Sequence, residues 1–120
     1  MPINSKRKGK VGELELAAIL RSHGWVGAQR GVQYKGSPGS ADVEGIPGVH
    51  FERKRVRALQ IYPSMAQARA DMGYGDIAVV SFRGNGVGKA ELAILTLEDF
   101  LGLLKKAGYG PQLEWEFKAS

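Results

Sequence analysis

Residues 42–54, DVEGIPGVHFERK, predict a β-hairpin with a short strand on each side of a Pro-Gly turn at 47–48. Side chains alternate between the two faces of a strand, so Glu52 and Lys54 are expected on the same face. A hairpin with this turn returns Asp42 to the neighbourhood of that pair. The segment therefore predicts two carboxylates and an ammonium group in one place.

Helical and strand patterns alternate on both sides of this hairpin. The run 77–82 is almost continuously apolar, which is typical of a strand buried on both faces. Pro63 is suited to the first position of a helix, and Thr96 with Asp99 forms a capping-box pattern at a helix start. The sequence predicts an α/β fold, a central mixed sheet of about five strands flanked by helices. The expected elements are a helix at 11–23, strands at 25–30, 42–46 and 49–53, a helix at 63–72, strands at 77–82 and 91–96, and a helix at 97–106.

The 120 residues are expected to form one domain. Within it, residues 1–10 form a basic N-terminal arm, and residues 110–120 form a tail with alternating apolar residues, expected as an edge strand or a dimer contact. The chain contains no cysteine, which excludes disulfides, zinc-thiolate sites and thiol catalysis. No apolar run approaches the ~20 residues needed to span a bilayer. Because the start also lacks the apolar segment of a signal peptide, we expect a cytoplasmic protein without a membrane partner.

The chain is basic, with a net charge of +5, which favours a polyanionic partner. Charge alone does not separate nucleic acid from an anionic membrane, but no basic amphipathic helix of the membrane-surface kind is present. Basic residues instead surround the paired acids, as expected for a site that attracts a phosphate backbone. The candidate backbone contacts are Arg7, Lys8, Lys10, Arg30, Lys35, Arg53, Arg55 and Arg57.

The hairpin acids have two competing interpretations. Converging carboxylates repel each other unless a cation joins them, and Mg²⁺ is a hard ion that binds one or two carboxylates, waters and phosphate oxygens. An acid-x-Lys pattern is also common on solvated, salt-bridged strands. The motif alone leaves both interpretations open.

Four short motifs occur in order along the chain: Lys8-Gly9 ahead of Glu13, Ser40-Ala41-Asp42-Val43, Phe51-Glu52-Arg53-Lys54-Arg55, and Gln67. Together they resemble the PD-(D/E)-x-K nuclease superfamily. More narrowly, the chain is similar to the archaeal-type Holliday junction resolvases and their small bacteriophage relatives, over about residues 6–100. The proline that usually precedes the first aspartate is Ala41 here, and that proline is not a ligand.

The resemblance implies a restriction-endonuclease-like core and a structure-selective endodeoxyribonuclease. Such an enzyme cuts four-way DNA junctions as a homodimer and uses Mg²⁺, for which Mn²⁺ substitutes. By the same resemblance Asp42 and Glu52 would hold the metal, with Glu13 completing its shell. Lys54 would position or deprotonate the attacking water, and Gln67 would contact the site from the second helix. Loop residues Ser37 and Ser40 would hydrogen-bond phosphate, although ordinary turn chemistry explains them equally well.

Other interpretations remain open at this point. A nicking, restriction-like or repair-like endonuclease acting on ordinary duplex fits the same motifs, and so does an inactive DNA-binding module on the same fold. Glu13 would also be favourable simply as a negative charge near a helix N-terminus. Glu15 is expected to face solvent, and His50 is expected to be structural.

Overall fold

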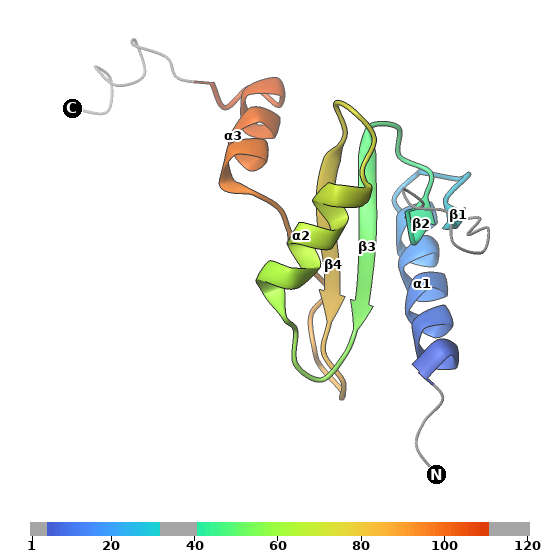
Figure 1. The fold of residues 1–120 in the computed structure, drawn as a ribbon. Coiled ribbons are helices and arrows are strands. Elements are labelled where there is room, and N and C mark those ends of the chain that lie inside the picture. The colour runs from blue at the N-terminus through green and yellow to red at the C-terminus, as the bar shows by residue number, and fades with distance from the viewer. Residues whose placement is uncertain (1–4, 32–40, 111–120) are drawn as a thin grey trace.

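The computed structural model describes residues 5–31 and 41–110, without the side chains of residues 5–8. Within these ranges the elements occur in the predicted order of one helix, three strands, a helix, two strands and a helix (Figure 1). The elements are α1 (Ser5–Ser22), β1 (Gln29–Arg30), β2 (Val43–Glu44), β3 (Val49–Arg55), α2 (Ile61–Asp71), β4 (Ile77–Arg83), β5 (Leu92–Ile94) and α3 (Leu97–Lys106).

The strands form one mixed sheet in the order β1-β2-β3-β4-β5. β3 and β4 are parallel, while the other neighbouring pairs are antiparallel. A parallel pair needs a crossover connection, and α2 supplies it between β3 and β4. The predicted α/β fold with a mixed five-stranded sheet is confirmed.

The helices α1 and α2 bury different faces of this sheet. Apolar residues of α1, including Leu16, pack with Phe51 of β3 and Val79 of β4. On the other face, Ala68 of α2 packs with Ala78 and Val80 of β4. Alternation along β3 then separates its charged residues, so that Arg53 lies on the α1 face while Glu52 and Lys54 lie on the α2 face.

Several boundaries differ from those that the sequence predicts. α1 begins at Ser5 rather than residue 11, because apolar periodicity does not detect a polar first turn, and Lys and Arg are good helix formers. Pro63 is the third residue of α2 rather than the first, where its missing N–H is still not needed by the helix. The predicted strand at 25–30 is reduced to the short β1. Of the tail predicted at 110–120, residues 111–120 lie outside the described residues.

α3 has the predicted cap. The Thr96 hydroxyl oxygen accepts a hydrogen bond from the Asp99 backbone N–H at 3.1 Å, which satisfies one of the free donors of the first turn. In the described ranges no helix combines the length and the apolar character required to cross a bilayer.

Candidate functional site

Asp42 lies immediately before β2 and is held against β3 by the backbone. Its own N–H donates to the Phe51 carbonyl at 2.9 Å, and its Oδ2 accepts a hydrogen bond from the Arg53 backbone N–H at 2.8 Å. Val43 pairs with Phe51 in antiparallel register, so the preceding residue comes opposite Glu52. Strand pairing therefore orients the first carboxylate toward the second.

Glu52 is a buried acid in the middle of β3. Its side chain is 8% exposed, and the pKa of its carboxyl is raised from 4.5 to about 7, chiefly by burial. The negative charges of Asp42 and Asp71 and a hydrogen bond with the Asp42 side chain contribute to this increase, while the positive charge of Lys54 acts against it. A carboxyl with this pKa is about half protonated near pH 7, and a bound cation would favour its ionised form.

Lys54 supplies the neighbouring positive charge. Its Nζ lies 3.7 Å from Oε1 of Glu52, and its side chain is 29% exposed, so the ammonium group is reachable from solvent. The structure thus brings together Asp42, Glu52 and Lys54, the three residues that the hairpin pattern places in one site. Two carboxylates, whose negative charges repel each other, supply hard oxygen donors and are a suitable donor set for Mg²⁺.

Glu13 is not gathered into this group. Its Oε1 accepts a hydrogen bond from Nε of Arg30 at 2.8 Å, and Arg30 pairs in β1 beside Val43, whose side chain packs on the α1 side of the sheet. Among residues 5–31 and 41–110, no three His, Cys, Asp or Glu side chains are close enough to hold one metal ion. A metal here would therefore rely on Asp42 and Glu52, with waters and substrate oxygens as its other ligands.

Two further side chains belong to the site's surroundings. Gln67 is exposed on α2, the helix that covers the Glu52 face. His50 is on the same strand face as Glu52 and is 3% exposed, and its Nε2 has no hydrogen-bond partner within the described residues. The structural role that the sequence suggests for His50 stays a prediction.

The raised pKa of Glu52 has a consequence for stability without metal. Between about pH 4.5 and 7 the folded protein binds more protons than the unfolded chain, so its free energy of unfolding falls as pH rises through that range. Glu52→Gln removes this dependence. At pH 8 in chelator we expect the variant to be more stable than the parent by up to about 3 kcal/mol, with little difference at pH 4. Urea unfolding at both pH values measures the difference in stability between the variant and the parent. An equal difference at both pH values would contradict a raised pKa for Glu52.

Arg53 is expected from the sequence to contact DNA, but the structure places its guanidinium inside the protein. The side chain is 1% exposed and donates to the Gly12 carbonyl at 2.9 Å and to Oγ of Ser81 at 2.9 Å. It also forms a two-pronged ion pair with Glu91, which immediately precedes β5. The prediction for Arg53 is wrong because strand alternation turns it toward α1, away from Glu52.

The expectation that Glu15 faces solvent is also wrong. Its carboxylate is 34% exposed and lies 3.1 Å from Nε of Arg55, 3.7 Å from Arg53 and 3.8 Å from Arg83. Arg55 further donates to the Asn85 side chain at 2.8 Å. This arginine is therefore engaged in linking α1 to the loop after β4, rather than free to bind a phosphate.

A basic pocket of about 580 Å³ lies at the ends of β3 and β4. Arg57 and Lys89 contribute its cations, and Phe82 contributes an apolar wall. Phe82 is the β4 partner of Lys54 in the parallel register, so one wall of the pocket comes from the strand position next to Lys54. Lys89 was not recognisable from the sequence, because a lysine after a glycine-rich turn carries no pattern of its own.

The structure describes only some of the other residues that are predicted to contact DNA. Lys10 is exposed near the start of α1, and Arg30 is 41% exposed although it is paired with Glu13. Arg7 and Lys8 lie on α1, but their side chains are not described. Lys35, Ser37 and Ser40 fall outside the described residues.

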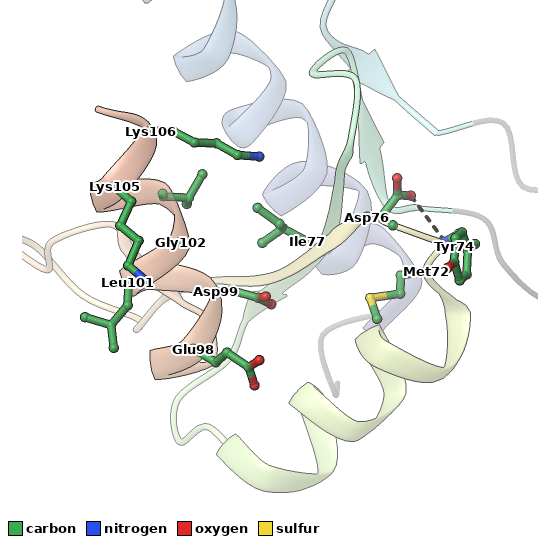
Figure 2. A pocket seen from close by; sticks show the side chains of 13 residues that line it. Met72, Tyr74, Asp76, Ile77, Glu98, Asp99, Leu101, Gly102, Lys105 and Lys106 are labelled. Atoms are coloured by element: carbon green, nitrogen blue, oxygen red, sulfur yellow. Dashed lines mark hydrogen bonds between the residues drawn. The ribbon is translucent and has the colours of Figure 1, made fainter. Parts of the chain in front are cut away.

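A larger cavity of about 820 Å³ is found elsewhere, between α3 and the segment Met72–Ile77 (Figure 2). The positions of the acidic residues that line this cavity are explained by local structure. Asp76 accepts a hydrogen bond from the Gly73 N–H at 3.2 Å, and Glu98 and Asp99 are in the first turn of α3, where negative charge is favourable. We therefore place the candidate site at the hairpin carboxylates and not in this cavity.

No family model, no curated protein and no solved structure matches this chain. A function for the protein has to be argued from the geometry of the site itself.

Proposed function

We propose that the protein is a Mg²⁺-dependent endodeoxyribonuclease that hydrolyses DNA phosphodiester bonds at four-way junctions, as a Holliday junction resolvase. The observation that carries the proposal is the pair of Asp42, which is half-buried, and Glu52, which is buried, with Nζ of Lys54 at 3.7 Å from Glu52. Metal-assisted hydrolysis needs oxygen ligands, a cation near the reacting phosphate and access for an anionic polymer. The hairpin offers the first two, and the basic strand ends offer the third.

The chain's own groups have distinct roles in this proposal. Asp42 and Glu52 would hold Mg²⁺, which when bound supplies Lewis-acid polarisation and a water of lowered pKa. The Arg53 backbone N–H, at 2.8 Å, fixes the orientation of the Asp42 carboxylate. Lys54 holds the attacking water by hydrogen bonding and stabilises the negative charge that develops on the phosphate. Glu52 must lose its proton before it binds a cation, and the nearby ammonium favours that loss.

The basic pocket is proposed to hold the DNA backbone beside the cleaved bond. Arg57 and Lys89 line it, and within the described residues neither forms an ion pair with a carboxylate. Their charges would contact phosphates without reading sequence. This arrangement agrees with a nuclease that recognises the shape of its substrate rather than a base sequence.

Lys89→Gln is expected to weaken junction binding and to reduce the slope of log K against log salt by about one, because one phosphate contact is lost. Lys106→Gln removes the same charge from α3 and serves as the matched control. Fluorescence anisotropy over a series of salt concentrations measures both slopes. Equal slopes for the parent and Lys89→Gln would exclude this pocket from the DNA interface.

The experiment that tests the proposed function compares a labelled four-way junction, a Y-fork and a linear duplex. Each is incubated with the protein in Mg²⁺, Mn²⁺ or chelator. We expect cleavage of the junction in either metal and none in chelator. Equal cleavage of the linear duplex would replace the resolvase proposal with a duplex nuclease, and junction binding without cleavage in either metal would indicate a DNA-binding module.

A further inference from the structure

The basic pocket at the ends of β3 and β4 contains an aromatic ring. In the sheet, Phe82 is the partner of Lys54 on one side and of Leu92 on the other. Phe82 follows Val80 by two residues, so its side chain lies on the α2 face of the sheet, which is also the face of Glu52. The ring is half-buried, and within the described residues it packs in neither of the two apolar clusters. Packing of the core therefore does not account for this ring.

The pocket stays open beside the ring because Gly84 has no side chain. A Cβ atom at this position would lie 3.9 Å from Cζ of Phe82 and 3.9 Å from Cγ and Cδ of Lys89. The aromatic ring and the aliphatic stem of the lysine thus converge on the space next to Gly84. The volume of about 580 Å³ falls within the range of sites that hold organic ligands, roughly 300 to 1,000 Å³.

The loop after β4 is held in place by two arginines. Arg55 donates to Oδ1 of Asn85 at 2.8 Å. Arg83 donates to the backbone carbonyls of Gly86 and Lys89, each at 3.3 Å. Because Arg55 occupies Oδ1 of Asn85, the NH₂ group of this amide is left to donate to a ligand. A wall that is already ordered lowers the entropic cost of binding.

We propose that this pocket binds one unpaired nucleotide of branched DNA, with its base stacked on Phe82 and its flanking phosphates on Arg57 and Lys89. The inference rests on the proposed function, since it takes DNA as the ligand. The lining contains both cations and, among the described residues, no carboxylate. Stacking on an aromatic ring tolerates any base, because every base has a π face. The pocket would therefore recognise unpairing and not sequence.

The composition of the pocket favours an unpaired nucleotide over a duplex backbone. Phosphates need only cations, whereas a ring, an apolar stem and an amide donor suit the face and the edge of a base. In a duplex both faces of each base are covered by its neighbours. Neighbouring strands lie about 4.8 Å apart, so a DNA strand that places a base on Phe82 can continue past Lys54 to the proposed metal site.

Two Y-forks that differ only in their unpaired arms test the inference. One fork carries thymidine arms, and the other carries the same arms without bases, so both present equal numbers of phosphates. Anisotropy titrations in chelator give both Kd values without cleavage. We expect the parent to bind the thymidine fork about tenfold more tightly, because one base stacked on an aromatic side chain contributes about that factor or more.

Variants of the pocket show whether this preference arises there. Phe82→Leu keeps an apolar side chain without a ring, and Gly84→Leu fills the space while keeping both cations. Each should bring the ratio of the two Kd values to about one and leave the affinity for the base-free fork unchanged, which also reports that the variant is folded. Gly27→Leu is the matched control, because Gly27 is exposed and a Cβ atom there would meet nothing within 4 Å. Lys89→Gln should weaken binding of both forks and keep the ratio.

The outcomes separate this inference from the proposed function. Equal affinity of the parent for both forks would overturn the nucleotide pocket, while cleavage of the four-way junction in Mg²⁺ would still support the nuclease. A preference that persists in Phe82→Leu and Gly84→Leu, or that is lost equally in Gly27→Leu, would place the base elsewhere and also overturn the inference. A parent that binds neither fork would contradict the nucleotide pocket and the proposed function together.

Discussion

Glu52→Gln is expected to reduce cleavage of a four-way junction in Mg²⁺ by about a thousandfold or more, because in the proposed mechanism about 4 kcal/mol of charge stabilisation depends on a metal held by this carboxylate. The substitution keeps the shape of the side chain but removes its charge and replaces one carboxylate oxygen with an NH₂ group. Junction binding should remain close to that of the parent, since the proposed backbone contacts lie on Arg57 and Lys89. Single-turnover cleavage and an anisotropy titration measure the two effects separately.

Asp42→Asn provides an independent test of the same pair. Asparagine retains a side-chain oxygen that can accept the Arg53 N–H, so the hairpin should fold normally while its metal affinity falls. We expect a loss of cleavage similar to that of Glu52→Gln. Glu44→Gln is the control, because Glu44 is an exposed acid of the same hairpin that accepts a hydrogen bond from Gln29 at 3.1 Å. Cleavage that persists in either Asp42→Asn or Glu52→Gln, or falls equally in Glu44→Gln, would contradict the metal assignment.

Arg53→Met should lower the free energy of unfolding by about 3 kcal/mol, a large fraction of the stability of a small domain. The variant leaves the Gly12 carbonyl and the Ser81 hydroxyl without their donor at 2.9 Å, and buried acceptors without partners cost about 1 to 3 kcal/mol each. Glu91 loses its partner as well, although at 33% exposed it is still partly solvated. The guanidinium therefore fastens α1, β4 and the start of β5 to β3.

The stability loss is measured by urea unfolding of the parent, Arg53→Met, Arg53→Lys and Arg57→Met. Arg53→Lys keeps the charge but loses the forked geometry, so it should fall between the parent and Arg53→Met. Arg57→Met removes an exposed arginine and should change the stability by less than about 0.5 kcal/mol. If Arg53→Met unfolds at the same urea concentration as Arg57→Met, the buried network does not have the role described.

The hairpin and its acids could be predicted because their signals are local. A Pro-Gly turn and a period of two along 49–54 are enough to place Glu52 and Lys54 on one face and Arg53 on the other. The same alternation puts Arg53 on the face opposite to the site, which argues against a DNA contact by this residue. The order of helices and strands follows equally from local patterns of apolar residues and caps.

The partners of the charged residues could not be predicted, because they come from distant parts of the chain. Arg53 meets Glu91 across 38 residues, and Arg55 meets Glu15 across 40. Such pairs depend on the parallel pairing of β3 with β4 and on the packing of α1, and neither leaves a trace in the local sequence. For the same reason the pairing of Glu13 with Arg30, and not with the hairpin acids, emerges only from the structure.

The central claim is that Asp42, Glu52 and Lys54 form a Mg²⁺-dependent site for phosphodiester hydrolysis. Its most direct test is a titration of Mg²⁺ into the chelator-treated protein with a labelled four-way junction, in which the amount of cleaved strand is measured. We predict no product without metal and saturable cleavage as Mg²⁺ is added. Product that forms at the same rate in chelator, or no product at any Mg²⁺ or Mn²⁺ concentration while the junction remains bound, would contradict the account.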